Sequence, residues 1–280
     1  MTETPRSAAR PTGFGYAAMR VFDLSIGEML WSRRTVFMGL VVGLPVLIAI
    51  IVRALLALRD APLTANGHTV TGPFIFGLII WLYMRFTVPV LGVFYGTSLI
   101  ADEVEDKTIT YLFTRPIPRS AILIGKYLAY LACTIFVVLP SVMIVWLLIV
   151  PIGGSLGANF LDLLKDLGLL ALGLAVYGAV FALIGSAMKR PLLSGLVFVL
   201  GWEPIAVALP GYLKRLSVAY YVQGLVPHAM PQDSPISLIQ GIFREVPGLG
   251  ESMIWLAIIL VACLWLAART VSRREYVLEQ

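Results

Sequence analysis

Residues 36–58 read VFMGLVVGLPVLIAIIVRALLAL, an apolar run that contains a single charge, Arg53. A helix that crosses the hydrocarbon layer of a bilayer, about 30 Å thick, needs roughly 20 mostly apolar residues. This run meets that requirement, and we expect further spans near 74–101, 121–150, 163–188, 192–213 and 252–268. The chain is therefore predicted to be an all-α polytopic membrane protein with six transmembrane helices and additional interfacial helices.

The composition supports a lipid environment. Of the 280 residues, 59% are hydrophobic and 13% are charged, whereas soluble domains are nearer half apolar and a quarter charged. The mean hydropathy is +0.90. A water-soluble globule of this length could not bury so much apolar side chain. The net charge of +5 then bears on membrane orientation, and we expect no nucleic-acid partner.

The positions of the basic residues predict the orientation. If both termini are cytoplasmic, fourteen Lys and Arg lie on the inner side and five on the outer side. Inner loops carry the excess of Lys and Arg, so both termini are predicted to face the cytoplasm. The first 35 residues hold no apolar core followed by a small-residue cleavage site, so we expect no removable signal peptide.

The domain organisation follows from these spans. We predict a cytoplasmic tail and interfacial helix at 1–35, a six-span transmembrane domain at 36–269 and a cytoplasmic tail at 270–280. Tyr16 to Arg34 places its apolar side chains in one helical sector, which is typical of an interfacial helix. The outer stretch 214–251 is expected to form short amphipathic helices at the membrane surface.

Metal and thiol chemistry find little support in the sequence. Cys133 and Cys263 lie inside apolar runs, which favours two buried side chains over a disulfide framework. His68 and His228 lie in separate outer loops without acidic or cysteine partners at ligand spacing. We predict no metal site.

The inner stretch 102–119 reads DEVEDKTITYLFTRPIPR and is longer than a simple turn requires. Its acidic opening suits a helix N-terminus, where negative charge is favourable. Ile109, Leu112 and Phe113 fall on one helical face, and Pro116 should end the helix near Arg115. The pattern predicts a short amphipathic helix on the cytoplasmic surface. Docking of another protein and simple burial in the headgroups remain open from this pattern alone.

The same stretch resembles the permeases of the ABC type 2 exporter family. The resemblance depends on an acidic stretch, a Thr, a Leu and an Arg-Pro that lead into a Gly-Lys at the next span. The residues that carry it are Glu103, Glu105, Lys107, Thr108, Leu112, Arg115, Pro116, Arg119, Gly125 and Lys126. The usual glycine before the threonine is replaced here by Lys107. The six-span layout matches the family along most of the chain.

This resemblance implies that residues 102–119 form a coupling helix, which binds a separate ABC ATPase subunit. ATP and Mg are then expected in that partner, with no cofactor and no enzymatic activity in this chain. The resemblance further implies a homodimer or a dimer with a related permease, in the lipid bilayer of the cell (inner) membrane. Gly125-Lys126 lacks the earlier glycine and the Ser or Thr of a phosphate-binding loop.

Two charges lie deep inside predicted spans. Arg85 is about eleven residues from the outer face and Glu203 about eleven residues from the inner face, so both are roughly 16 Å deep. Intramembrane charge is costly and often functional. We hypothesise that Arg85 and Glu203 pair and line or brace the central pathway; a structural lock or a water-filled crevice is an equal alternative. Arg53 is nearer an interface and can snorkel.

Other functions have weaker support in this sequence. An ion-coupled secondary transporter should show several midplane acids, and Glu203 is the one expected deep in a span. An intramembrane enzyme should show a catalytic set at one depth, and none is evident. A non-transporting membrane scaffold remains possible, and the sequence does not identify a transported substrate.

Overall fold

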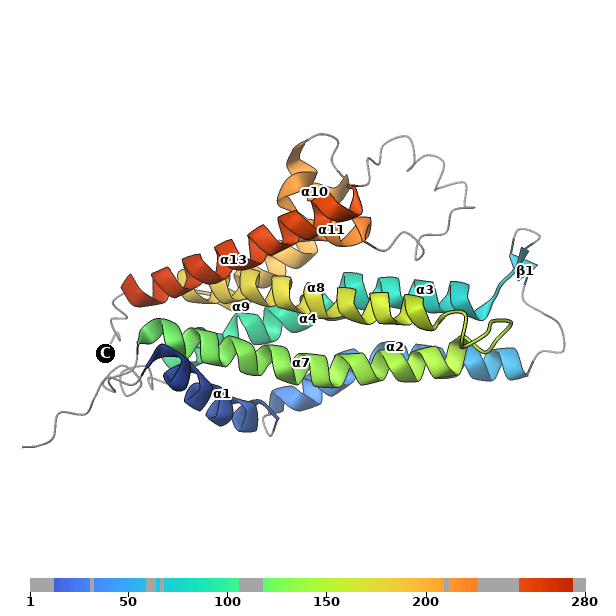
Figure 1. The fold of residues 1–280 in the computed structure, drawn as a ribbon, viewed down its shortest axis with the longest axis horizontal. Helices are drawn as coiled ribbons and strands as arrows, with labels where there is room; N and C mark the ends of the chain where they lie inside the picture. The colour runs from blue at the N-terminus through green and yellow to red at the C-terminus, as the bar shows by residue number, and fades with distance from the viewer. Residues whose placement is uncertain are drawn as a thin grey trace, which may run out of the picture.

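The computed structural model describes residues 13–30, 33–58, 64–65, 68–105, 118–208, 212–225 and 247–273. Long helices form a bundle with their axes along one main direction (Figure 1). In the described residues the only strands are β1 (Thr64–Ala65) and β2 (His68–Thr69), which pair antiparallel. The predicted all-α class is confirmed.

Five described helices are long and apolar enough to cross a membrane, which confirms a polytopic membrane protein. They cover Thr35–Ala57, Gly72–Ala101, Arg119–Ile149, Phe160–Ala187 and Leu249–Arg273. The first belongs to α2 (Arg33–Ala57), and the last three are α7, α8 and α13. The helix α13 extends beyond the predicted span 252–268 at both ends. It begins at Leu249, directly after Gly248, and polar residues continue it to Arg273.

The second span, Gly72–Ala101, is not a uniform α-helix. It consists of α3 (Gly72–Leu82), the π-helical turn η1 (Tyr83–Thr87), α4 (Val88–Leu91), the π-helical turn η2 (Gly92–Gly96) and the start of α5 (Ser98–Glu105). The two wide turns lie in the middle of the span, where a regular helix would have kept every hydrogen bond at i to i−4.

The fifth predicted span, 192–213, is wrong at its outer end. The structure has α9 (Pro191–Val197), the π-helical turn η3 (Phe198–Trp202) and α10 (Glu203–Ala208). A 3-10 helix, η4 (Tyr212–Leu216), and then α11 (Val218–Gly224) follow. Pro210 and Gly211 interrupt the apolar run and disfavour a continuous helix. This segment is therefore shorter than the other five.

Successive spans alternate in direction. The connection between α7 and α8 lies at the same end of the bundle as β1 and β2 (Figure 1). The end of α8, the start of α7 and the end of α13 lie at the opposite end. Six alternating segments therefore bring Phe14 and Arg273, the outermost helical residues, to one end of the bundle, as the predicted six-pass layout requires.

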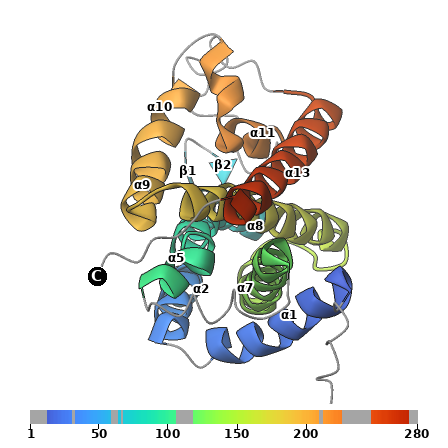
Figure 2. The same cartoon turned by 90° about the vertical axis from the view of Figure 1, so that its left-hand side faces the viewer.

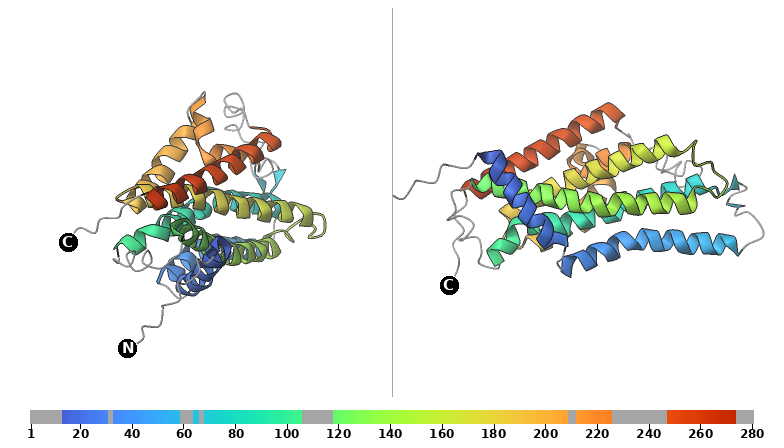
Figure 3. Two further views of the ribbon diagram at one scale, coloured as in Figure 1. Left: turned by 60° about the vertical axis from the view of Figure 1, so that its left-hand side comes forward. Right: turned by 60° about the horizontal axis from the view of Figure 1, so that its bottom comes forward.

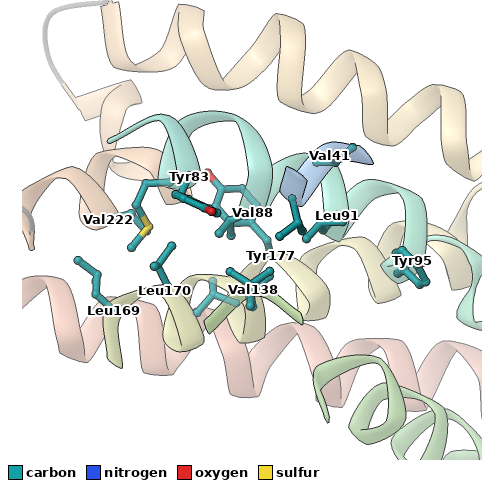
Figure 4. Packing of buried hydrophobic residues seen from close by; sticks show 14 of the residues in the cluster. Val41, Tyr83, Val88, Leu91, Tyr95, Val138, Leu169, Leu170, Tyr177 and Val222 are labelled. Atoms are coloured by element: carbon teal, nitrogen blue, oxygen red, sulfur yellow. The ribbon is translucent and has the colours of Figure 1, made fainter. Parts of the chain in front are cut away.

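Helix α8 lies at the centre of the bundle and packs against α7, α13 and the second span. Figure 4 shows Tyr83 and Val88 of the second span beside Leu170 and Tyr177 of α8. Small residues permit this closeness: a Cβ at Gly178 would overlap the ring of Tyr130, and one at Gly185 would overlap the carbonyl of Thr97. Such small-residue contacts are typical of membrane helix packing.

Large apolar side chains cover the outside of the bundle. Val36, Phe136 and Val261 are exposed by 76%, 74% and 66%. In water such a surface would aggregate, whereas hydrocarbon tails solvate it. The exposed apolar faces of α2 and α13 are therefore suited to a lipid environment.

The helix α1 (Phe14–Leu30) lies crosswise to the spans (Figure 2) and crosses the first turns of α7 (Figure 3). Ala17 and Ala18 are buried against Ala121. A Cβ at Gly125 would lie 2.5 Å from the carbonyl oxygen of Ala18, so only glycine allows this approach. A helix precedes the first span as predicted, but its bounds are Phe14–Leu30 rather than Tyr16 to Arg34.

Candidate functional site

The carboxylate of Glu203 is the most extensively bonded polar group described within the bundle. Glu203 is the first residue of α10 and is 3% exposed. Its Oε1 accepts a hydrogen bond from the backbone N–H of Val218 at 3.1 Å. Its Oε2 accepts bonds from the N–H of Ala219 at 3.0 Å, the hydroxyl of Ser217 at 3.0 Å and the hydroxyl of Tyr177 at 3.2 Å.

These donors come from two parts of the chain, residues 217–219 and α8. Val218 and Ala219 are the first two residues of α11, whose N–H groups have no partner inside the helix. The positive end of a helix also favours a negative charge. Tyr177 adds a donor from α8. Glu203 therefore fastens α10, α11 and α8 together, and these bonds offset the cost of burying its charge.

Arg85 lies in the π-helical turn η1 and is partly buried. The described residues contain no ion pair between Arg85 and Glu203, whose carboxylate receives uncharged donors instead. The predicted direct pair is therefore not formed here. The two residues lie in different segments, Arg85 in η1 and Glu203 at the start of α10.

A π-helical turn precedes the proline in each of these two spans. Pro89 is the second residue of α4, directly after η1, and Pro204 is the second residue of α10, directly after η3. A proline lacks an N–H and its ring collides with the carbonyl four residues earlier in a regular helix. A wider turn relieves that collision and places Arg85 and Glu203 at the distortion. The distortion before Pro204 is thus a π-helical turn.

The predicted coupling segment 102–119 is described only at its two ends. The backbone of Glu103 and Glu105 belongs to α5, and Arg119 begins α7. Lys107, Thr108, Leu112, Arg115 and Pro116 lie outside the described residues. The last residues of α5 and the first of α7 lie at the end of the bundle that also holds the start of α1 (Figure 1). The segment joins two spans at that end.

Sequence reasoning missed three buried polar residues. Tyr177 and Ser217 supply donors to Glu203, yet Tyr177 stands in an apolar run and Ser217 in an outer connection. Ser217 directly precedes α11, and a serine before an apolar run is a recognisable N-cap pattern. Asp166, in α8, is 1% exposed, so Glu203 is not the one buried acid of the spans. The spacing of Asp166 from Leu163 and Leu170, three residues before it and four after it, was a signal for it, because that spacing places all three on one helical face.

The arrangement is suited to holding helices rather than to bond-making chemistry. Across the described ranges no three His, Cys, Asp or Glu residues gather as metal ligands would. Tyr127 and Tyr130 of α7 donate hydrogen bonds to the backbone carbonyls of Ala175 and Leu174 in α8, at 2.8 and 3.0 Å. These tyrosines connect α7 to α8, and the Glu203 carboxylate connects α8 to α10 and α11, so α8 takes part in both sets of contacts.

Comparison with known proteins identifies the family of the chain. A family model described as ABC-2 family transporter protein matches residues 12–270, nearly the whole sequence. No curated protein matches the chain. The match includes α1, all the spans and the segment whose motif resembled this family. The chain therefore belongs to the ABC-2 family of transporter proteins and is a multi-pass membrane permease of an ABC transporter.

Proposed function

We propose that this permease belongs to an ATP-driven exporter and is coupled to a separate ATPase subunit through residues 102–119. One observation carries the proposal. The segment leaves the second span at α5 and enters the third at Arg119, at the end of the bundle where α1 also begins. A soluble subunit bound at that end could move both spans at once.

Helix α7 is placed to receive such a movement. It begins directly after the segment, and α1 packs on its first turns at Gly125 and Ala121. Because packed helices move as units rather than deforming continuously, a displacement of residue 119 carries α1 and α7 together. We assign α1 and the start of α7 as the rigid body next to the ATPase.

A set of contacts leads from that body to the outer half of the protein. Tyr127 and Tyr130 connect α7 to α8 through backbone carbonyls. Tyr177, three residues beyond Leu174 on α8, bonds to Glu203. Glu203 in turn holds the first turn of α11. In this proposal, ATP-driven closure moves α7 and α8 moves with it. The hydrogen bonds of Glu203 then make α10 and α11 move together with α8.

The proposal also includes a second permease, the nucleotide and the membrane orientation. The permease works as a homodimer or with a related permease, and ATP and Mg bind the partner ATPase. It lies in the cell (inner) membrane with both termini in the cytoplasm, which places residues 102–119 on the same side as ATP. The fourteen basic residues assigned to that side support this orientation.

Purification of the tagged chain from its native membrane tests the coupling. We expect an ABC ATPase to co-purify and to hydrolyse ATP, and a Leu112→Asp variant to lose the ATPase because a charge enters the apolar docking face. Lys165→Ala is the matched control: its side chain is exposed and bonds Asp162 in the first turns of α8, at the opposite end of the bundle. Equal ATPase recovery with all three chains would contradict docking at 102–119.

Transport direction has its own test. Inside-out vesicles that contain the intact complex should lose cargo from the outer medium on addition of ATP, because the exporter's cytoplasmic face is then exposed to that medium. ATP-dependent uptake by right-side-out vesicles with internal ATP would instead indicate an importer.

A further inference from the structure

Arg85 occupies a position on an exposed apolar face of the second span. Phe74, Leu78 and Trp81 are large and exposed, and they share one helical sector with residue 85 at spacings of four, three and four. Arg85 lies near the middle of Gly72–Ala101. Arg85, itself only partly buried, therefore lies on this sector of the helix near the middle of the span.

Nothing in the described part of the chain neutralises this charge. No hydrogen bond and no ion pair involves Arg85 there. Glu203, the acid predicted to pair with Arg85, is 3% exposed and already accepts four hydrogen bonds. Two of these bonds come from the first N–H groups of α11, so the oxygens of Glu203 are already occupied by donors other than Arg85.

A guanidinium near the centre of a bilayer is costly and usually pairs with an anion or lines a water-filled space. It is always charged, and its planar fork matches the two oxygens of a phosphate or carboxylate. The same face offers the exposed side chains of Trp81 and Phe86 as apolar contacts beside the charge. This combination suits a molecule with an anionic group attached to a hydrocarbon part.

We propose that Arg85 binds the anionic headgroup of an amphiphile that reaches the second span from the bilayer. The apolar part of the amphiphile lies along Leu78 and Trp81, and its headgroup accepts hydrogen bonds from the guanidinium. If the proposed export function holds, on which this further step rests, the cargo belongs to the class of anionic amphiphiles and Arg85 is a specificity-determining residue. Binding itself requires neither ATP nor the ATPase.

Native mass spectrometry of the full-length protein in detergent tests the binding. The probes are phosphatidylglycerol and phosphatidylcholine with identical acyl chains. We expect wild-type protein to bind phosphatidylglycerol about tenfold more tightly than phosphatidylcholine, as two charge-assisted hydrogen bonds allow. Arg85→Gln should lose this preference and Arg85→Lys should keep part of it, because lysine retains the charge without the fork. Arg53→Gln is the matched control, since Arg53 is an exposed arginine of α2.

Each outcome decides the proposal. A preference that survives in Arg85→Gln, or that disappears equally in Arg53→Gln, overturns it. Full displacement by inorganic phosphate would assign the site to a soluble anion and would also overturn it. If Arg85→Gln lowers the dimer fraction and leaves lipid binding unchanged, an acid of a second subunit meets Arg85 and the proposal fails. If Arg85→Gln is poorly folded, wild type against Arg85→Lys still decides, because an unchanged preference contradicts bidentate binding. These results stand whether or not an ATPase co-purifies, so they separate this inference from the proposed function.

Discussion

The hydroxyl of Tyr177 donates a hydrogen bond of 3.2 Å to the carboxylate of Glu203, across the interface of α8 and α10. The same carboxylate oxygen accepts a bond from Ser217 at 3.0 Å. The contact connects the central helix of the bundle to the segment that reverses direction before α13. Loss of this carboxylate would leave buried donors on both sides of the interface.

Replacement of Glu203 by Ala should strongly destabilise the protein. Four donors lose their acceptor, and removal of one partner from a buried charged cluster typically costs about 3–5 kcal/mol. Glu203→Gln keeps one acceptor oxygen and should lose roughly half as much. Thermal unfolding can be followed with a thiol-reactive dye, because Cys133 is buried and Cys263 partly buried in the folded protein. Glu251→Gln, at an exposed acid in the first turn of α13, should change the melting temperature little. An unchanged melting temperature for Glu203→Ala would refute the role assigned to the cluster.

Tyr177 and Ser217 should be energetically coupled, since both bond to Oε2 of Glu203. Tyr177→Phe and Ser217→Ala each remove a bond to a charged acceptor, at a cost of about 1.5–3 kcal/mol. The double variant should depart from additivity by roughly 0.5–3 kcal/mol in a cycle of unfolding free energies. Tyr127→Phe is the control: it removes a bond to the neutral carbonyl of Ala175 and should combine additively with Ser217→Ala. Additive losses for Tyr177 and Ser217 would show that the two hydroxyls act separately.

The membrane architecture could be predicted from the sequence because hydrophobic length is a local property. Runs such as 36–58 and 121–150 gave spans with ends close to those observed. The prediction for 192–213 was wrong at its outer end because hydropathy does not detect helix ends: Pro204 and Pro210 lie in an apolar run, yet α10 ends at Ala208. The return of α11 toward Glu203 depends on long-range contacts that no local pattern contains.

The site was predictable only in part for a similar reason. A glutamate in the middle of a span is costly wherever its partners are, so Glu203 was identifiable from sequence. Charge matching suggested Arg85 as its partner, yet the structure supplies hydroxyl and backbone donors from 14 to 26 residues away. Such partners are set by the fold and carry no charge pattern of their own. Residues 106–117 lie outside the described ranges, so the coupling helix stays a prediction.

Gly178→Ala should destabilise the α7–α8 interface. A Cβ at this position overlaps the ring of Tyr130, whose hydroxyl bonds to Leu174. Overpacking of this kind usually costs about 1–3 kcal/mol. Gly168→Ala in the same helix is the matched control, because nothing lies within 4 Å of its Cβ position. Alanine in an open helical site should stabilise by roughly 0.5–1 kcal/mol. The melting temperatures of both variants check this prediction. A higher melting temperature for Gly178→Ala than for wild type would disprove the close contact.

Gly125→Ala should loosen α1 from α7. A Cβ there lies 2.5 Å from the carbonyl oxygen of Ala18 and 2.8 Å from Cβ of Val21, and backbone cannot move aside as a flexible side chain can. Hydrogen exchange should become faster across Phe14–Leu30 while α13 is unaffected. Gly15→Ala, a site on α1 with nothing within 4 Å, should leave this exchange unchanged or slower. If Gly125→Ala protects α1 as well as wild type, α1 does not depend on this contact, and its role as a rigid unit with α7 is lost.

The orientation of the bundle predicts the side from which single cysteines react. Ser155, between α7 and α8, and Lys189, between α8 and α9, are exposed at opposite ends. With the basic residues retained in the cytoplasm, a membrane-impermeant maleimide should label Ser155→Cys in intact cells and Lys189→Cys only after permeabilisation. Wild-type protein is the background control, because Cys133 is buried and Cys263 lies within α13. The reverse labelling pattern would place residues 102–119 outside the cell, where no ATPase could use cytoplasmic ATP to move them, and the coupling proposal would then be untenable.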